Sequence, residues 1–272
     1  MHNYESSHRV FPPGSLGYPF VWSPQAQLLP YVEQGSLQNL LVFQAPLMVA
    51  FGSGFDPVVV GRNESAAKSS IPLLTCPSDK ERVPNSPYGG ISYPANAGSG
   101  INQADIATDD GSVSNADGVI FQRSKIGFRD VTDGTSNTVA FGEQLLGDGI
   151  NSAPSGNDFR HRVVELPMAT QTTDAACTAI GAPAWSGQRG AKWINGHMAD
   201  AMYNHYFIPN AKVADCHNGY QNFAITSARS AHVGGVQAAL VDGGVRFFSE
   251  NLDLTAWRSI ATRGGGEMVS EF

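Results

Sequence analysis

The clearest pattern of apolar and polar positions lies near the end of the chain. Two apolar runs, residues 236–241 and 245–249, flank the tripeptide Asp242-Gly243-Gly244. An Asp-Gly pair between two β-rich runs is typical of a tight hairpin turn, because glycine reaches the required positive φ without steric cost. The pattern therefore predicts a strand, a tight turn and a second strand.

A helix is predicted directly after this hairpin. Asp253 is suited to the N-cap position, Arg263 to the last turn and Gly264 to the stop. The apolar stripe of the helix is predicted to consist of Leu254, Trp257, Ile260 and Ala261.

The first part of the chain is predicted to be helical. Residues 1–9 have the pattern of the last turns of a helix, which a Pro-Pro-Gly sequence then ends. Ser23 as N-cap and Pro24 at the first helical position predict a second helix, which Pro30 kinks or divides. A third short helical segment is predicted to open at Ser36.

The middle of the chain gives weaker patterns. Residues 71–79 predict a short buried strand that enters a turn, and residues 138–141 alternate like a strand with one polar face. The sequence Asp-Gly-Thr-Ser-Asn at 133–137 predicts a polar turn whose side chains hydrogen-bond their own backbone. Residues 46–70 and 144–184 are predicted to be loops.

Composition adds the fold class. Only 15% of the 272 residues are charged, whereas Gly (30) and Pro (16) are frequent. Few charges and many turn formers favour short strands and long loops over a helical bundle. We therefore expect an α+β fold, a single domain over residues 1–272, with an antiparallel sheet packed on an N-terminal helix.

Charge and hydropathy exclude some partners. The formal net charge is −7, and no basic run occurs. Nucleic-acid binding rests on clustered Lys and Arg, so no nucleic-acid partner is expected. The apolar runs fall short of the roughly 18–20 residues that a membrane-spanning helix needs.

Several segments resemble a known family. His232 is followed by nine residues and then by Asp242-Gly, Val-Arg-Phe and a helix that contains Trp-Arg. The Asp-Gly-Thr-Ser-Asn turn continues to Glu143 in a second motif, at 133–143. The two motifs together resemble a large planctomycete family known as domain of unknown function 1559. Weaker matches lie at 22–34, 71–79, 92–98, 190–196 and 204–216.

The resemblance implies a pseudopilin-like fold and place of work. The family carries a prepilin-type N-terminus with a long hydrophobic helix and is described as similar to the major pseudopilin of type II secretion. It implies a pseudopilin head with long loop insertions, in an extracytoplasmic setting at the cell surface or in the periplasm. Residues 1–14 resemble the segment just after the hydrophobic helix, so we expect this chain to be the soluble part of a longer precursor.

The first functional hypothesis follows from this resemblance. It is a non-enzymatic, pseudopilin-like component of a cell-surface fibre or a type II secretion-like apparatus. Such a component would assemble with itself or with other pseudopilins through the missing N-terminal helix. That helix would also be its only contact with the membrane.

Calcium is the candidate cofactor. Asp109, Asp110 and Asp117 lie in an acidic loop with Ser and Asn residues, and Asp133 opens the polar turn. Dense hard oxygen ligands suit calcium, but the spacing departs from the EF-hand loop and no Glu closes it. A solvated acidic loop and a simple polar turn explain these residues without an ion, and we favour that interpretation.

A second hypothesis is a surface carbohydrate-binding module, in which calcium could assist. Trp185 and Trp193 lie in Gly-rich surroundings, where they could stack on the sugar rings of a polysaccharide, and Asn137 could bind sugar hydroxyls. Buried packing is the commoner role of tryptophan.

A third hypothesis is an extracytoplasmic hydrolase. His232 and Asp242 would act with Ser230 or Ser227, since catalytic triads are recognised by geometry and not by order. The chain has no Gly-x-Ser-x-Gly nucleophile elbow. We favour the alternative that His232 caps a strand end and Asp242 makes an Asx turn.

The three cysteines leave their pairing open. Cys177 and Cys216 could pair and leave Cys76 over, but an odd count weakens any disulfide argument. The extracytoplasmic setting that the resemblance implies would preserve one bridge. Cys76 could be reactive, but we expect an inert buried thiol. No Cys-x-x-Cys or His-x-x-x-His pair occurs, so structural zinc is not expected.

Overall fold

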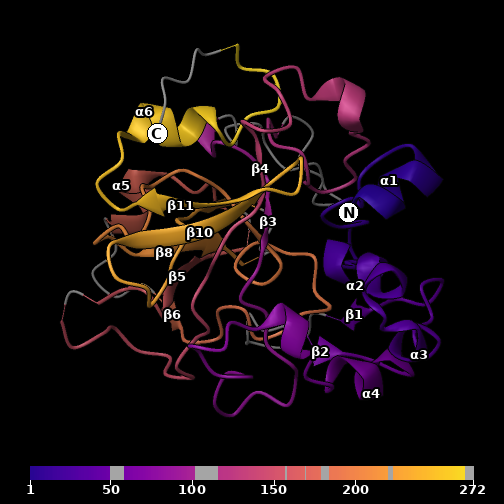
Figure 1. Ribbon diagram of the computed structural model, residues 1–272. Coiled ribbons are helices and arrows are strands. Elements are labelled where there is room, and N and C mark those ends of the chain that lie inside the picture. Colours follow the sequence, from indigo (N-terminus) through magenta and orange to yellow (C-terminus); the bar gives the residue numbers. More distant parts are fainter. Residues whose placement is uncertain are drawn as a thin grey trace.

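The N-terminal part of the chain is mainly helical. The computed structural model describes residues 1–49, 58–101, 116–156, 158–168, 170–178, 184–219 and 223–266. Its first helices are α1 (His2–His8), α2 (Pro24–Leu28), η1 (Leu29–Val32), α3 (Gly35–Gln38), α4 (Asn63–Ala67) and η2 (Pro72–Leu74). Helices α1 to α4 lie together on one side of the molecule, shown in indigo and purple in Figure 1.

The capping signals in this part are confirmed. The Ser23 hydroxyl accepts a hydrogen bond from the backbone N–H of Ala26 at 3.0 Å, and Pro24 is the first residue of α2. Pro30 falls where α2 gives way to η1, so it divides the predicted helix. Helix α1 is small and has no buried residue.

The larger sheet contains the C-terminal hairpin. Its strand order is β11-β10-β4-β3-β7. These strands are β3 (Ala95–Asn96), β4 (Val139–Phe141), β7 (Met202–Tyr203), β10 (Gly235–Leu240) and β11 (Val245–Ser249). Gly243 has φ 95°, and Asp242 Oδ1 accepts a hydrogen bond from the N–H of Gly244 at 2.8 Å. The predicted hairpin and its Asx turn are therefore confirmed.

A second sheet has the order β6-β5-β8-β9. Its strands are β5 (Val163–Leu166), β6 (Ala184–Ser186), β8 (Asp215–Asn218) and β9 (Ala224–Ile225). A two-stranded ladder of β1 (Met48–Val49) and β2 (Val58–Val59) lies beside the N-terminal helices. The remaining helices of the described residues are η4 (Phe128–Asp130), α5 (Asp174–Thr178) and α6 (Leu254–Ser259).

The structure confirms the α+β class and corrects its details. The sheets are mixed, because β3 pairs with β7 and β5 with β8 in parallel. The strand predicted within residues 71–79 is instead the short helix η2, which starts at Pro72. Helix α6 begins after Asp253 as predicted but ends at Ser259, before Arg263. The segments predicted as loops, 46–70 and 144–184, contain short elements of two to five residues, too short to show periodicity.

Helix α6 covers the hairpin (Figure 1). Asp253 caps it by accepting hydrogen bonds from two N–H groups of its first turn. Trp257 is fully buried and packs with Val236 and Phe248 of the hairpin. None of the helices in the described part of the chain has the length and apolarity that a bilayer crossing requires.

A buried ion cluster supports the second sheet. Asp215 of β8 is fully buried, and both Arg189 and Arg229 pair with its carboxylate. Burial acts to raise the pKa of Asp215, but the two guanidinium charges outweigh it and hold the pKa below its usual range. Arg229 also donates to the carbonyls of Ala211 and Val213. The cluster therefore fixes the segment that leads into β8.

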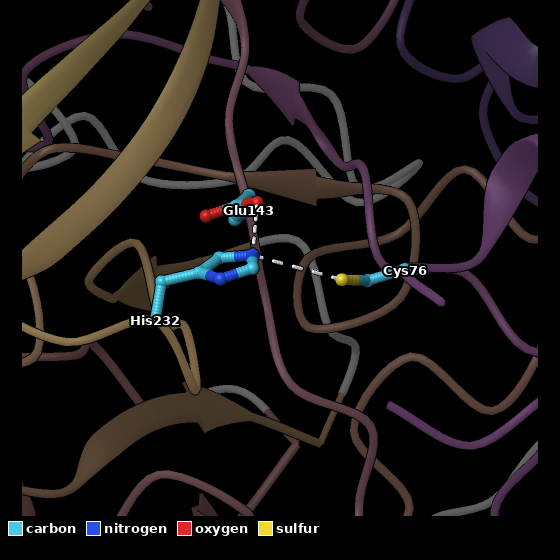
Figure 2. Close-up of side chains that lie close together, drawn as sticks. All are labelled: Cys76, Glu143 and His232. Atoms are coloured by element: carbon cyan, nitrogen blue, oxygen red, sulfur yellow. Dashed lines mark hydrogen bonds and ion pairs between the residues drawn. The ribbon is translucent and has the colours of Figure 1, made fainter. Parts of the chain in front are cut away.

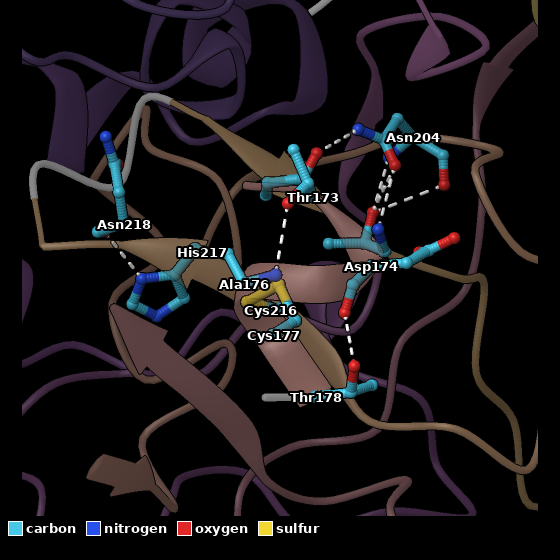
Figure 3. The surroundings of a disulfide bond; sticks show 11 residues. Thr173, Asp174, Ala176, Cys177, Thr178, Asn204, Cys216, His217 and Asn218 are labelled. Atoms are coloured by element: carbon cyan, nitrogen blue, oxygen red, sulfur yellow. Dashed lines mark hydrogen bonds between the residues drawn. A yellow bond between two sulfur atoms is a disulfide. The ribbon is translucent and has the colours of Figure 1, made fainter. Parts of the chain in front are cut away.

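A disulfide lies next to this cluster. Cys216 follows Asp215 in β8 and is bonded to Cys177 of α5, 39 residues earlier in the sequence (Figure 3). Cys76 is left as the free cysteine. Of the pairings that the sequence left open, the structure forms this one.

We expect the Asp215→Ala substitution to destabilise the fold by about 3–5 kcal/mol, because it leaves two guanidinium groups in the interior without their counter-charge. Urea denaturation followed by fluorescence measures the change. The matched control combines Asp215→Leu, Arg189→Met and Arg229→Met. Its free energy of unfolding should fall by less than that of Asp215→Ala. A single variant as stable as the wild type would contradict the assigned role.

Replacing Cys177 and Cys216 together by serine should lower the free energy of unfolding by about 4 kcal/mol. The bridge closes a loop of 39 residues. Without it the unfolded chain gains conformational entropy, and for a loop of this length that gain corresponds to about 4 kcal/mol. The Cys76→Ser variant is the control and should unfold at the same urea concentration as the wild type in metal-free buffer. Equal midpoints for all three proteins would show that the bridge does not form.

Candidate functional site

Three side chains from distant parts of the chain meet at Cys76, Glu143 and His232. Figure 2 shows the imidazole of His232 between the carboxylate and the sulfur. Nε2 of His232 lies 3.5 Å from Glu143 Oε1 and 3.9 Å from Cys76 Sγ. One potential ligand atom from each residue lies within 4.8 Å of the other two.

Backbone hydrogen bonds place Cys76 beside the strand end that carries Glu143. Cys76 follows η2, and its carbonyl accepts a hydrogen bond from the N–H of Asp79 at 2.9 Å. The N–H of Ser92 donates to Leu74 O at 2.7 Å, and the N–H of Gln144 donates to Ser92 O at 2.8 Å. The segment around Ser92 therefore joins the two flanking segments.

Glu143 and His232 are placed by the hairpin. Glu143 comes two residues after β4, and its carbonyl accepts from the N–H of Arg229 at 2.8 Å. Its Oε2 accepts from the N–H of Gln237 in β10 at 2.8 Å, which leaves Oε1 beside the imidazole. The N–H of His232 donates to Ser230 Oγ at 3.1 Å, which fixes the turn before β10.

The site is closed on one side and open on the other. The Glu143 side chain is 7% exposed, whereas that of His232 is 40% exposed. Cys76 is half-buried. The carboxylate therefore forms the inner wall, and solvent reaches the imidazole directly.

Two tyrosines lie near enough to the cluster for its side chains to affect their pKa values. Burial raises the pKa of Tyr93 to about 12, and the neighbouring Cys76 and Glu143 add to the shift. Burial also raises the pKa of Tyr203, and the negative charge of Glu143 acts in the same direction. The Tyr203 hydroxyl occupies the space that a Cβ at Gly142 would take, so a glycine is required there.

A buried histidine, His205, contacts one of these tyrosines. His205 stacks on Trp257 with ring centroids 3.7 Å apart, and its Nδ1 lies 2.8 Å from Trp257 O. Its Nε2 lies 2.9 Å from the Tyr203 hydroxyl. Burial lowers the pKa of His205 from 6.5 to about 3, although the bond to the Trp257 carbonyl opposes the shift. His205 is therefore neutral in the folded protein at physiological pH.

The geometry of the cluster does not fit a catalytic triad. In a triad the nucleophile and the orienting carboxylate contact opposite nitrogens of the imidazole. Here both Cys76 Sγ and Glu143 Oε1 face the same nitrogen, Nε2 of His232. Three donor atoms that converge on one point are an arrangement that suits a bound cation.

Comparison with known proteins gives a family. Residues 1–255 match the model of the family described as "Protein of unknown function (DUF1559)". The chain belongs to this family. No curated protein and no solved structure matches it significantly.

Each residue of the cluster lies in a segment for which the sequence suggested a resemblance to DUF1559. Cys76 lies in the 71–79 segment, Glu143 ends the 133–143 motif and His232 opens the C-terminal motif. Sequence reasoning named only His232 as a site residue. Cys76 and Glu143 could have been found by a simple signal: each of these separate segments contains a residue that can bind a metal or take part in catalysis.

The proposed hydrolase triad is not assembled. His232 and Asp242 flank the six-residue strand β10 at opposite ends, and a strand rises by about 3.3 Å per residue. Ser230 is 3% exposed and accepts from the His232 N–H, while Ser227 donates to the carbonyls of Ile208 and Ala228. The structure therefore does not bring the three residues together and places His232 beside Glu143 and Cys76.

The acidic residues have internal partners where they are described. Both carboxylate oxygens of Asp117 accept hydrogen bonds from Ser99. Asp133 accepts from the N–H groups of Gly265 and Gly266 at 2.7 and 2.9 Å. These carboxylates tie loops together. Two other candidate calcium ligands, Asp109 and Asp110, lie outside the described residues.

The candidate carbohydrate residues do not form one surface. Trp193 is fully buried, and its indole N–H donates to Ser69 O at 3.0 Å, so it cannot stack on a sugar at the surface. Trp185 in β6 is half-buried and stacks on Phe159. Asn137 is exposed and donates to Asp133 O at 3.2 Å, as a turn residue would.

We expect His205 to make the protein acid-sensitive. Between pH 6.5 and 3 the unfolded chain binds a proton at this position and the folded chain does not, so stability falls as the pH falls through this window. The slope approaches about 1.4 kcal/mol per pH unit. Urea denaturation at pH 7, 6, 5 and 4 measures it.

The matched control for this measurement is His205→Phe, which keeps a ring against Trp257 and removes the titration. Its stability should fall less steeply with decreasing pH than that of the wild type. Parallel pH profiles for the two proteins would contradict the buried, neutral state of His205.

Proposed function

We propose that this member of DUF1559 is a non-enzymatic, pseudopilin-like component of a cell-surface fibre or type II secretion-like apparatus. The observation that carries the proposal is the disulfide between Cys177 and Cys216. Disulfides persist in the periplasm and at the cell surface but are rare in the reducing cytosol. The bridge supports an extracytoplasmic place of work.

The candidate site supports a non-enzymatic role. Among the described residues, the parts of the proposed hydrolase triad lie apart, and His232 directs one nitrogen at both of its neighbours. An acid–base relay needs both ring nitrogens, one for the nucleophile and one for the orienting group. A binding or structural role fits this arrangement better.

The edge of the larger sheet supports assembly between copies of the chain. Strand β11 is the last strand in the order of this sheet, and its side chains Val245 and Phe247 are 66% and 49% exposed. In the described part of the chain no strand pairs with its outer edge, and an unpaired edge with apolar side chains is a template for pairing with another strand.

We expect the full-length gene product, cross-linked on intact cells of its own organism, to appear in the surface fraction as oligomers. The Val245→Lys variant should give at least several-fold less oligomer, because a lysine on an edge strand opposes pairing. Val233→Lys is the matched control, since Val233 is 97% exposed and lies outside the strand. Denaturing gels and thiol alkylation of the same fractions give both readouts.

Two outcomes would contradict the proposal. Recovery of the protein in the cytoplasmic fraction with Cys177 and Cys216 reduced would exclude the extracytoplasmic setting. A protein that stays monomeric at the cell surface would exclude the assembly role.

A further inference from the structure

We infer that Cys76, Glu143 and His232 bind one transition-metal ion of the Zn²⁺ type, with a coordination position open to solvent. The inference does not depend on the proposed assembly role. The sequence contains no short zinc motif. The three ligands leave no such motif because they are separated by 67 and 89 residues (143 − 76 and 232 − 143).

The distances match the edges of a small coordination sphere. Zinc lies about 2.0–2.3 Å from nitrogen, oxygen and sulfur ligands, so tetrahedral ligands lie about 3.3–3.6 Å from one another. Nε2 of His232 is 3.5 Å from Glu143 Oε1 and 3.9 Å from Cys76 Sγ. The third pair, Cys76 Sγ and the Glu143 carboxylate, lies within 4.8 Å, so the half-buried Cys76 side chain must move toward Glu143 to close the sphere.

The donor set selects the class of metal. Thiolate and imidazole are ligands for zinc and related transition metals, whereas calcium and magnesium take oxygen ligands. Only Glu143 offers oxygen in this cluster. The same set therefore argues against calcium at this position.

Hydrogen bonds hold the carboxylate ready for the ion. Glu143 Oε2 is occupied by the N–H of Gln237, and this bond turns Oε1 toward His232. Such outer-shell partners orient the ligands of metal sites in proteins. The backbone bonds of Ser92 and Arg229 fix the two neighbouring segments against the one that carries Glu143.

Three protein ligands leave one tetrahedral position for water. The 40% exposed side chain of His232 lies on the open side, so an ion and its water can reach the site from solvent. The ion would replace the proton of the Cys76 thiol, which passes to solvent. The ion would clamp three separate segments and stabilise only the folded chain.

The experiment titrates the metal-free full chain with Zn²⁺ by calorimetry and with Co²⁺ by absorption spectroscopy. We expect one equivalent to bind with a micromolar or tighter dissociation constant, and Co²⁺ to give a thiolate charge-transfer band. Cys76→Ser, Glu143→Gln and His232→Asn should each weaken Zn²⁺ binding at least tenfold. His8→Asn, which changes an exposed histidine of α1, should leave it unchanged.

A second readout does not depend on the folding of any variant. Zn²⁺ should slow the alkylation of Cys76 by iodoacetamide at least tenfold in the wild-type protein, whereas Ca²⁺ should not. The inference is overturned if Zn²⁺ binds with unchanged affinity in Cys76→Ser, if Co²⁺ gives no thiolate band, or if alkylation proceeds at the same rate with and without Zn²⁺.

Discussion

The pairing of β4 with β10 joins the middle of the chain to its C-terminal hairpin. Ala239 pairs with Phe141 and Leu240 with Val139, across a shift in register. This pairing brings Glu143, just after β4, to the backbone of Gln237 in β10. Glu143 is the least exposed member of the cluster, and its Oε1 faces the imidazole of His232.

Burial of polar groups shapes the rest of the molecule. The carboxylate of Asp215 is held by Arg189 and Arg229, and His205 is held neutral between Tyr203 and Trp257. Buried polar groups of this kind are costly unless every partner is in place. These contacts therefore hold the strands in a defined arrangement. The strands are two to six residues long, which is too short to fix that arrangement by their own pairing.

The proposed function and the metal site concern different parts of the same fold. The disulfide and the exposed strand β11 bear on where the protein works and how copies meet. The cluster of Cys76, Glu143 and His232 lies where three segments converge. A metal there would stabilise the fold, which is compatible with membership of DUF1559 and independent of the mode of assembly.

The sequence alone determined the local features with strong signals. Ser23, the Asp242 turn and Asp253 act as predicted, because caps and turns depend on a few neighbouring residues. The α+β class and the family also followed from the sequence. Tertiary structure decided the parallel strand pairs, the burial of Trp193 and the meeting of Cys76 with Glu143. These depend on contacts between residues far apart in the chain, for which local periodicity and spacing carry no signal.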